Sequence, residues 1–539
     1  MKRLIPAACS SLVMFIILVL LGSLMTPPSS VTANTQHISV QTRDTSIAAE
    51  GFTVPHEGTY KTKESRITIA LTDSVSIHAI VREPIGATGK RPACLFLHGA
   101  GTGDSSEVYG DVASALASAG IVTLVPDKRL DNYSALHRDY PQMAQDYGKS
   151  FDVLKQWPGV DPHKTGLYAE SEGTWISSII TAQRHDIAFS ILTSAPVVSG
   201  RQQMSMAAST YFADSGAPQE LINDVPKLTS MDFSAIGLNY ANFNSTPYLN
   251  KLTQPVLVNY GTDDLSMPIE QGAQTILKHT ADAGNTNVTV RYYPANHQMR
   301  TGSHLSEPGL PLESSYTRNL EDWINAVTMG ATSKDWATPM IAGDQPSQRY
   351  AAPTSLSSGL ISSLGTLLVL LVAALGLCVL CGINGLAIAI RAMLRPASQT
   401  NNSSVSGHIH QGFARGIAAP LSILIVLSAT SLLATLWYVA SSAVQALSLH
   451  RASALFVDVW VLLRVAAVVL VLVFGWMSST LIVHAHDARI AHGQSAQGNH
   501  QQDSISIARG FGHISVVVLG LLASVLVMVS LAFWGLYSF

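Results

Sequence analysis

The sequence predicts an α/β domain with a mostly parallel sheet and helices on both faces, followed by an all-α membrane region of about four helices. Three observations predict this class. Short apolar strands alternate with helical stretches in residues 34–335, long apolar runs follow residue 356, and only 12% of residues are charged, whereas soluble domains carry about 25%. A net charge of −3 offers no basic surface for nucleic acid, so we expect no such partner.

The N-terminal residues 1–33 have the pattern of a secretory leader. Lys2 and Arg3 precede an apolar core at 12–25, and small residues lead to a cleavage-type site at Ala33. The segment is either a cleaved signal peptide or an uncleaved signal anchor. Both alternatives send the domain that follows across the membrane.

Residues 34–335 contain the alternating strands and helices. The stretches "RITIALT" and "SIHAIVRE" alternate apolar and polar residues, as an antiparallel pair does. Six more strands have the continuous apolar pattern of buried parallel strands: "ACLFLHG", "IVTLVPD", "KTGLYAE", "IAFSILTSA", "PVLVNYG" and "VTVRYYP". Helical stretches are expected at about 105–119, 140–156, 173–184 and 268–282, with a closing helix at 312–328. This alternation predicts a parallel sheet covered on both faces.

Residues 336–356 are rich in Pro, Ser, Ala and Gln and are predicted to be a linker. The membrane domain, 357–539, then holds four apolar runs, each long enough to cross a bilayer: roughly 357–390, 416–440, 454–483 and 512–537. Arg464 lies inside the third run and is expected to pair with a neighbouring helix.

The distribution of arginines predicts the orientation of these runs. Arg391, Arg395 and Arg415 flank the first loop and Arg489 and Arg509 flank the third, whereas the second loop has only Arg451. The positive-inside rule places the first and third loops in the cytoplasm. We therefore expect a multi-pass protein of the cell membrane whose α/β domain lies on the extracytoplasmic side.

Three side chains that acyl transfer requires follow predicted strands in the order Ser, Asp, His. Ser171 follows "KTGLYAE", an aspartate pair, Asp263 and Asp264, follows "PVLVNYG", and His297 follows "VTVRYYP". In a parallel sheet the carboxyl ends of the strands meet at one edge, where ligands bind. A serine needs a histidine to take its proton and a carboxylate to orient that histidine. His304 is the alternative base.

The sequence around Ser171 reads Ala169-Glu170-Ser171-Glu172-Gly173, a small-x-Ser-x-Gly motif between a strand and a helix. Over residues 60–330 the chain resembles the α/β-hydrolase superfamily. Two segments, "LVPDKRLDNYS" and "DVLKQWPGVDPHKTGLYAESEGTWI", are similar to bacterial serine esterases related to dienelactone hydrolases.

The resemblance implies a role for each candidate residue. Ser171 is the nucleophile and His297 the base, and the spacing of Asp264 from Gly261 and Pro268 favours Asp264 over Asp263 as the acid. The backbone N–H groups of Ala100 and Glu172 form the oxyanion hole, with Gly101 as the next candidate. The family also places lids after the sixth strand, so residues 196–252 are expected to form a small helical cap.

These expectations describe a membrane-tethered, outward-facing serine hydrolase that cleaves a small-molecule or lipid carboxylic ester without a cofactor or metal. An acyltransferase acting on envelope lipids or glycans is one alternative. A transporter or sensor whose hydrolase-like domain only binds ligand is another, although the complete Ser-Asp-His set argues against it. A peptidase is less supported.

Overall fold

The computed structural model describes residues 4–27, 31–101, 103–355, 357–394, 412–414, 416–495 and 507–538. The chain divides into two compact units. We call Ser29–Thr210 with Phe233–Leu356 the sheet unit, and Met1–Pro28, Tyr211–Asp232 and Ser357–Phe539 the helical unit. Lys2, Arg3, Arg395 and Arg415, which entered the predictions of the leader and of membrane orientation, lie outside the described residues.

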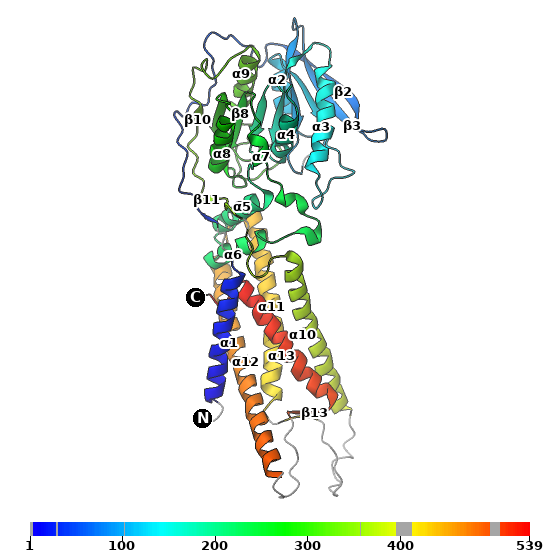
Figure 1. Cartoon of the computed structure of the whole chain (residues 1–539), viewed down its shortest axis with the longest axis vertical. Coiled ribbons are helices and arrows are strands. Elements are labelled where there is room, and N and C mark those ends of the chain that lie inside the picture. Colours follow the sequence, from blue (N-terminus) through cyan, green and yellow to red (C-terminus); the bar gives the residue numbers. More distant parts are fainter. Residues whose placement is uncertain are drawn as a thin grey trace. The chain divides into compact units, whose positions relative to one another are not determined.

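The sheet unit is built on a nine-stranded sheet in the order β10-β9-β8-β7-β6-β4-β5-β3-β2 (Figure 1). Its strands are β2 (Lys61–Ala70), β3 (Ser76–Ile85), β4 (Arg91–Leu97), β5 (Val122–Pro126), β6 (Val160–Glu170), β7 (Ser190–Thr193), β8 (Val256–Gly261), β9 (Val288–Tyr293) and β10 (Ile341–Gly343). β2 and β3 pair antiparallel, β3 pairs antiparallel with β5, and the remaining neighbours are parallel. The predicted hairpin and parallel sheet are confirmed.

Helices cover both faces of this sheet. They are α2 (Gly110–Ser118), α3 (Tyr140–Lys155), α4 (Glu172–Gln183), α8 (Ile269–Asp282) and α9 (Tyr316–Thr328). Leu95 and Leu167 pack in one cluster with α3 and α4, whereas Phe96 and Tyr168 pack in another with α2 and α9. Because side chains alternate along a strand, the central strands are apolar on both faces.

The predicted linker, 336–356, is packed onto the sheet unit. Within it, β10 pairs with β9 as an edge strand, and β11 (Tyr350–Ala351) pairs with β1 (Thr32–Ala33). The backbone N–H of Gln348 donates to Glu270 Oε1 at 2.7 Å. The segment lacks strand propensity, but the open edge of β9 provides main-chain partners that draw it into the sheet.

The insertion between β7 and β8 is helical, as expected for 196–252, but it is divided between the two units. It comprises α5 (Gly200–Asp214), α6 (Gln219–Thr229), the short η1 (Ser234–Ile236) and η2 (Asn239–Asn242), and α7 (Thr246–Leu249). Residues 211–232, which include α6, belong to the helical unit. The predicted cap is therefore not a single body on the sheet unit.

The helical unit contains five helices that are long and apolar enough to cross a membrane. They are α1 (Leu4–Met25), α10 (Leu364–Met393), α11 (Ala418–Leu447), α12 (Ala454–Ser495) and α13 (Phe511–Phe533). The predicted apolar runs correspond to α10–α13, and the leader forms the fifth helix. A short pair, β12 (Gly412–Phe413) and β13 (Ala508–Arg509), completes the described part of this unit.

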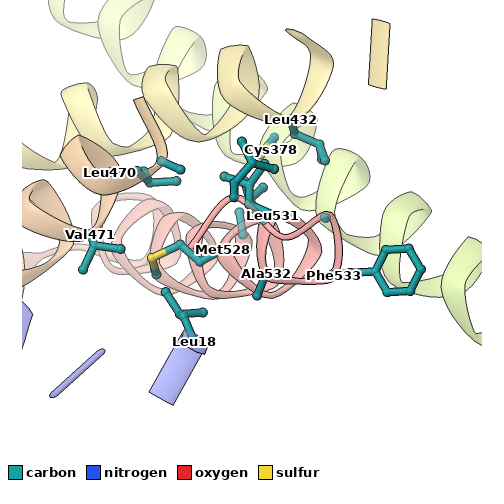
Figure 2. Close-up of a cluster of buried hydrophobic side chains, with 14 of the residues drawn as sticks. Leu18, Cys378, Leu432, Leu470, Val471, Met528, Leu531, Ala532 and Phe533 are labelled. Carbon is teal, nitrogen blue, oxygen red and sulfur yellow. The ribbon is translucent and has the colours of Figure 1, made fainter. Parts of the chain in front are cut away.

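Helix α13 is the centre of the helical unit. In the apolar 18-residue stretch of α13, 61% of the residues are buried, against 22–33% in the corresponding stretches of the other four helices. Figure 2 shows Met528, Leu531 and Ala532 of α13 among side chains of the other four helices, such as Leu18, Cys378, Leu432 and Leu470. Small residues allow close approach, since a Cβ at Gly475 of α12 would lie 2.0 Å from Ser11 Oγ of α1.

Helix α6 is fastened to the other helices of the helical unit by charged side chains. Glu220 Oε1 accepts from Arg464 Nη1 at 2.9 Å, so the predicted helical partner of Arg464 is α6. Lys227 Nζ donates to the Phe533 carbonyl at 2.9 Å and lies 2.7 Å from Asp224 Oδ1. Both carbonyl and carboxylate satisfy the buried ammonium, which otherwise would be costly to bury.

Candidate active site

Ser171 stands on a sharp turn between β6 and α4. Its backbone has φ 52° and ψ −121°, a strained conformation for a residue with a side chain. The backbone N–H of Ser171 donates to Thr193 O at 2.9 Å, and Thr174 Oγ1 donates to Ser171 O at 2.7 Å. The side chain makes no capping bond to α4. The turn is thus held by its backbone while the hydroxyl stays available.

The turn requires glycine at position 173. A Cβ there would lie 2.5 Å from Leu97 O and 3.0 Å from His98 O, both at the end of β4. No side chain fits at such distances without a backbone shift. The small residue at the end of the motif is therefore demanded by the approach of α4 to β4.

Gly173→Ala should lower the free energy of unfolding by about 1–3 kcal/mol, because the added methyl overlaps backbone. Gly148→Ala is the matched control, since Gly148 lies inside α3 with nothing within 4 Å of the added Cβ. That change should be neutral or stabilising by about 0.5–1 kcal/mol. Thermal unfolding of both variants provides the measurement, and equal behaviour would contradict the steric argument.

Asp264 and His297 are brought together by the neighbouring ends of β8 and β9. His297 Nδ1 lies 2.8 Å from Asp264 Oδ2, while Asp264 Oδ1 accepts from the N–H groups of Ser266 and Met267 at 2.8 and 3.2 Å. Gly261 permits this approach, because a Cβ there would lie 2.1 Å from Ala295 O. The Asp264 side chain is fully buried, so the carboxylate is fixed and shielded.

The alternative pair, Asp263 and His304, is solvent-exposed and loosely spaced. Their closest side-chain atoms are 3.8 Å apart, and the two side chains are 47% and 56% exposed. An exposed pair at this distance contributes little and cannot hold a histidine in one orientation. The geometry favours Asp264 with His297.

Glu170 and His297 influence each other's ionisation. Burial lowers the pKa of His297, but the charge of Asp264, its hydrogen bond and the charge of Glu170 raise it above the ordinary value. Burial raises the pKa of Glu170 from 4.5 to about 7, and the charges of His297 and Arg300 limit that rise. The residue before the serine is therefore a carboxyl group that titrates near neutral pH.

The loop after β4 lies directly against the serine. A Cβ at Gly99 would be 3.3 Å from Ser171 Cβ, a tight contact that shows how closely the loop approaches the serine. The next residues, Ala100 and Gly101, are exposed, and Gly101 has φ +76°. Thr102 lies outside the described residues. The structure thus places the predicted oxyanion loop beside Ser171, with Glu172 at the first turn of α4.

The Glu172 side chain points into a buried cationic cluster and not toward solvent. Its carboxylate accepts from Lys128 Nζ at 3.1 Å, Tyr133 OH at 2.8 Å, Arg138 Nη1 at 2.6 Å and Tyr140 OH at 3.1 Å. Sequence reasoning assigned no role to these four residues. One signal could have pointed to the cluster: Lys128 lies two residues after the apolar β5, and a lysine that is buried at such a position requires a carboxylate.

A cleft of about 730 Å³ opens in the sheet unit beside Glu170, the residue before Ser171. It is lined by Glu170, Gly101, Gln298 and Arg300 among others. Arg300 Nη1 lies 2.6 Å from Asp111 Oδ2 on α2. The cleft is polar around the carboxyl of Glu170 and is large enough for a small acyl or alcohol group.

The ligand atoms of one group of side chains lie close enough together to hold a metal ion, but an arginine already contacts the group. Ligand atoms of His56, Glu321 and Asp322 lie within 4.8 Å of one another. Arg318 Nε donates to Asp322 Oδ2 at 2.8 Å, and Arg318 Nη2 lies 2.9 Å from His56 Nε2. The guanidinium supplies the positive charge that a cation would bring.

Comparison with known proteins gives one family match and several structural likenesses. Residues 147–326 match the family described as BAAT / acyl-CoA thioester hydrolase C terminal, a range that includes Ser171, Asp264 and His297. A putative dienelactone hydrolase from Klebsiella pneumoniae is 13% identical, with 50% of this chain and 100% of that chain covered and a TM-score of 0.34. Est1E from Butyrivibrio proteoclasticus is 14% identical, with 49% and 97% covered and a TM-score of 0.33.

Proposed function

We propose that the chain is a membrane-associated serine hydrolase of the α/β-hydrolase type, which cleaves carboxylic esters with Ser171, His297 and Asp264. One observation carries the proposal. Ser171 occupies a strained turn at the end of β6, and the neighbouring ends of β8 and β9 hold His297 paired to Asp264 at 2.8 Å. With His297 Nε2 turned to Ser171 Oγ, as we propose, this pairing would activate the serine hydroxyl.

The reaction proceeds in two halves. Ser171 Oγ attacks the acyl carbonyl carbon, and His297 Nε2 takes the hydroxyl proton while Asp264 stabilises the imidazolium. The N–H groups of Ala100 and Glu172 hold the oxyanion, and the N-terminal dipole of α4 adds positive potential. Collapse expels the alcohol with the proton from His297. Water then attacks the acyl-enzyme by the same roles and releases the acid.

A thioester substrate is the second candidate, because the matched family is described by acyl-CoA thioester hydrolysis. A thiolate leaves more readily than an alkoxide, so the same serine would cleave either bond. Acyl transfer to an alcohol acceptor would use the same acyl-enzyme. Parallel assays with p-nitrophenyl esters, acyl thioesters of matched chain length, and an added alcohol separate the three.

We place the sheet unit outside the cell and retain α1 as an anchor. The packing of α1 against α12, with Ser11 facing Gly475, supports its retention after synthesis. The arginine bias between the apolar helices supports the orientation. Protease treatment of intact cells tests it: cleavage within the sheet unit without lysis is expected, and full protection would reverse the orientation.

Labelling by a fluorophosphonate tests the nucleophile. The purified full chain should be labelled, since an activated Ser171 Oγ displaces fluoride from phosphorus. Ser171→Ala should abolish labelling and reduce kcat by on the order of 10⁴-fold or more. Ser178→Ala is the matched control, because its Oγ donates to Trp175 O within α4. Labelling that persists in Ser171→Ala would refute the proposed nucleophile.

A further inference from the structure

Lys128 links the two backbone segments that form the oxyanion hole of the proposed hydrolase. Its Nζ donates to the Gly99 carbonyl at 2.6 Å and to Glu172 Oε2 at 3.1 Å. The Gly99 carbonyl belongs to the same peptide unit as the N–H of Ala100. Glu172 supplies the second N–H. One ammonium group therefore contacts the carbonyl of one donor peptide and the side chain of the residue that supplies the other donor.

Fixing the Gly99 carbonyl also fixes the direction of the Ala100 N–H. The peptide unit is planar, and in the trans form its C=O and N–H point in opposite directions. Because Gly99 lies against Ser171, a rotation of this peptide would move the N–H relative to the serine. Removing an oxyanion donor from its place typically costs about 100- to 1,000-fold in kcat.

Stability alone does not account for a lysine at this position. The side chains of Lys128 and Glu172 are 1% and 2% exposed, and replacing both members of a buried ion pair by apolar residues is often neutral or stabilising. Glu172 would also remain satisfied without Lys128, because Tyr133, Arg138 and Tyr140 donate to it. What Lys128 adds to these bonds is its contact with the Gly99 carbonyl.

The charge of the cluster also suits this role. Glu172 contacts two cations, Lys128 and Arg138, so one positive charge is left uncompensated among these contacts. In a buried, low-dielectric position such a charge acts over several ångströms. It lies on the carbonyl side of the Gly99–Ala100 peptide, where it polarises the N–H toward an oxyanion.

We propose that Lys128 is a positioning residue that holds the Gly99–Ala100 peptide and the first turn of α4 in the geometry of the oxyanion hole. It acts through the two backbone donors and not through contact with the substrate. This inference rests on the proposed serine-hydrolase function and adds a residue to it.

The test uses the detergent-solubilised full chain with Lys128→Met, Lys128→Gln and a control, Lys155→Met. Lys155 also forms an ion pair, with Asp186 at 2.7 Å, and it lies at the last turn of α3. For p-nitrophenyl butyrate we expect kcat to fall about 100-fold in Lys128→Met and less in Lys128→Gln, with KM within about threefold. Lys155→Met should retain wild-type kcat.

Inhibition by a trifluoromethyl ketone provides a measurement that would not change if Lys128 had only a structural role. It adds to the serine and places a negative oxygen in the hole, so its Ki should weaken in Lys128→Met by about the factor lost from kcat/KM. The midpoint of thermal unfolding should change little, because Tyr133, Arg138 and Tyr140 still donate to Glu172. If Lys128→Met does not fold, Lys128→Gln, which keeps a neutral donor, carries the same comparison.

Three results would overturn the role of Lys128: wild-type kcat in a folded variant, an unchanged Ki, or a rise in KM that accounts for all lost activity. Ser171→Ala separates this failure from failure of the proposed function. If Ser171→Ala is inactive while Lys128→Met is normal, only the positioning role is wrong. If Ser171→Ala keeps its activity, the function assigned to the whole site is wrong.

Discussion

Asp264→Asn should reduce kcat by about 10⁴-fold and leave the fold intact. Asp264 Oδ2 holds His297 Nδ1 at 2.8 Å, and an amide can present N–H to that nitrogen and so favour the wrong tautomer. The variant retains a side-chain oxygen for the N–H groups of Ser266 and Met267, so the loop should keep its shape. Steady-state kinetics and circular dichroism measure the two halves of this expectation.

Asp263→Asn is the matched control for that change. It alters the neighbouring residue in the same loop, but its carboxylate is 47% exposed and lies 3.8 Å from His304. We expect activity within about twofold of wild type. A large loss in Asp263→Asn together with normal Asp264→Asn would exchange the roles of the two aspartates.

The stability of Glu170→Gln relative to wild type should be greater above neutral pH than at acidic pH, by on the order of 3 kcal/mol. Burial raises the pKa of Glu170 from 4.5 to about 7, and each tenfold change in proton affinity corresponds to about 1.4 kcal/mol. Between these pH values the folded state keeps a proton that the unfolded chain has lost. In the wild type, the stability contributed by this retained proton is fully present below pH 4.5 and is lost as pH rises through 7, whereas Glu170→Gln does not undergo that loss.

Glutamine carries no charge at any pH, so the stability difference between Glu170→Gln and wild type should grow as pH rises from about 4.5 to about 8. Denaturant unfolding across this range measures it. Glu50→Gln removes an exposed carboxylate of the sheet unit and should show no such growth. A difference that does not vary with pH would contradict the buried, neutral-to-charged transition of Glu170.

Glu170→Gln should also alter the pH dependence of catalysis. The base must be neutral to accept a proton, so activity falls below the pKa of His297. The charge of Glu170 helps to raise that pKa, and its removal should move the acidic limb of the kcat/KM profile to lower pH. An unmoved limb would show that Glu170 does not act on the base.

The strands and the positions of Ser171, Asp264 and His297 could be predicted because both depend on local pattern and one topological rule. Buried parallel strands are continuous apolar runs, and side chains just past their carboxyl ends must meet at one edge. The edge strand β10 could not be predicted in this way. It forms because β9 offers unpaired backbone groups and not because Ile341–Gly343 has a strand pattern.

The cluster around Glu172 depends on contacts that are distant in sequence. Lys128 follows β5, Arg138 precedes α3, and both reach a residue of α4 through long side chains. The position of Lys128 after a strand could indicate a buried cation, but sequence spacing does not identify Glu172 as the carboxylate on which these side chains converge. The assignment of α6 to the helical unit likewise depends on the surface against which its apolar face packs. The eleven residues of α6 do not specify that surface.

The division of the β7–β8 insertion between the two units determines how the protein can be truncated to a soluble fragment. The chain passes from one unit to the other four times, after residues 28, 210, 232 and 356. A secreted fragment made by removing only the two ends would still carry residues 211–232, including Leu221 of α6 and the following Met231, which are buried among the helices in the whole protein. That surface would invite aggregation. A soluble version should replace residues 211–232 with a short polar connection as well as omit both apolar termini.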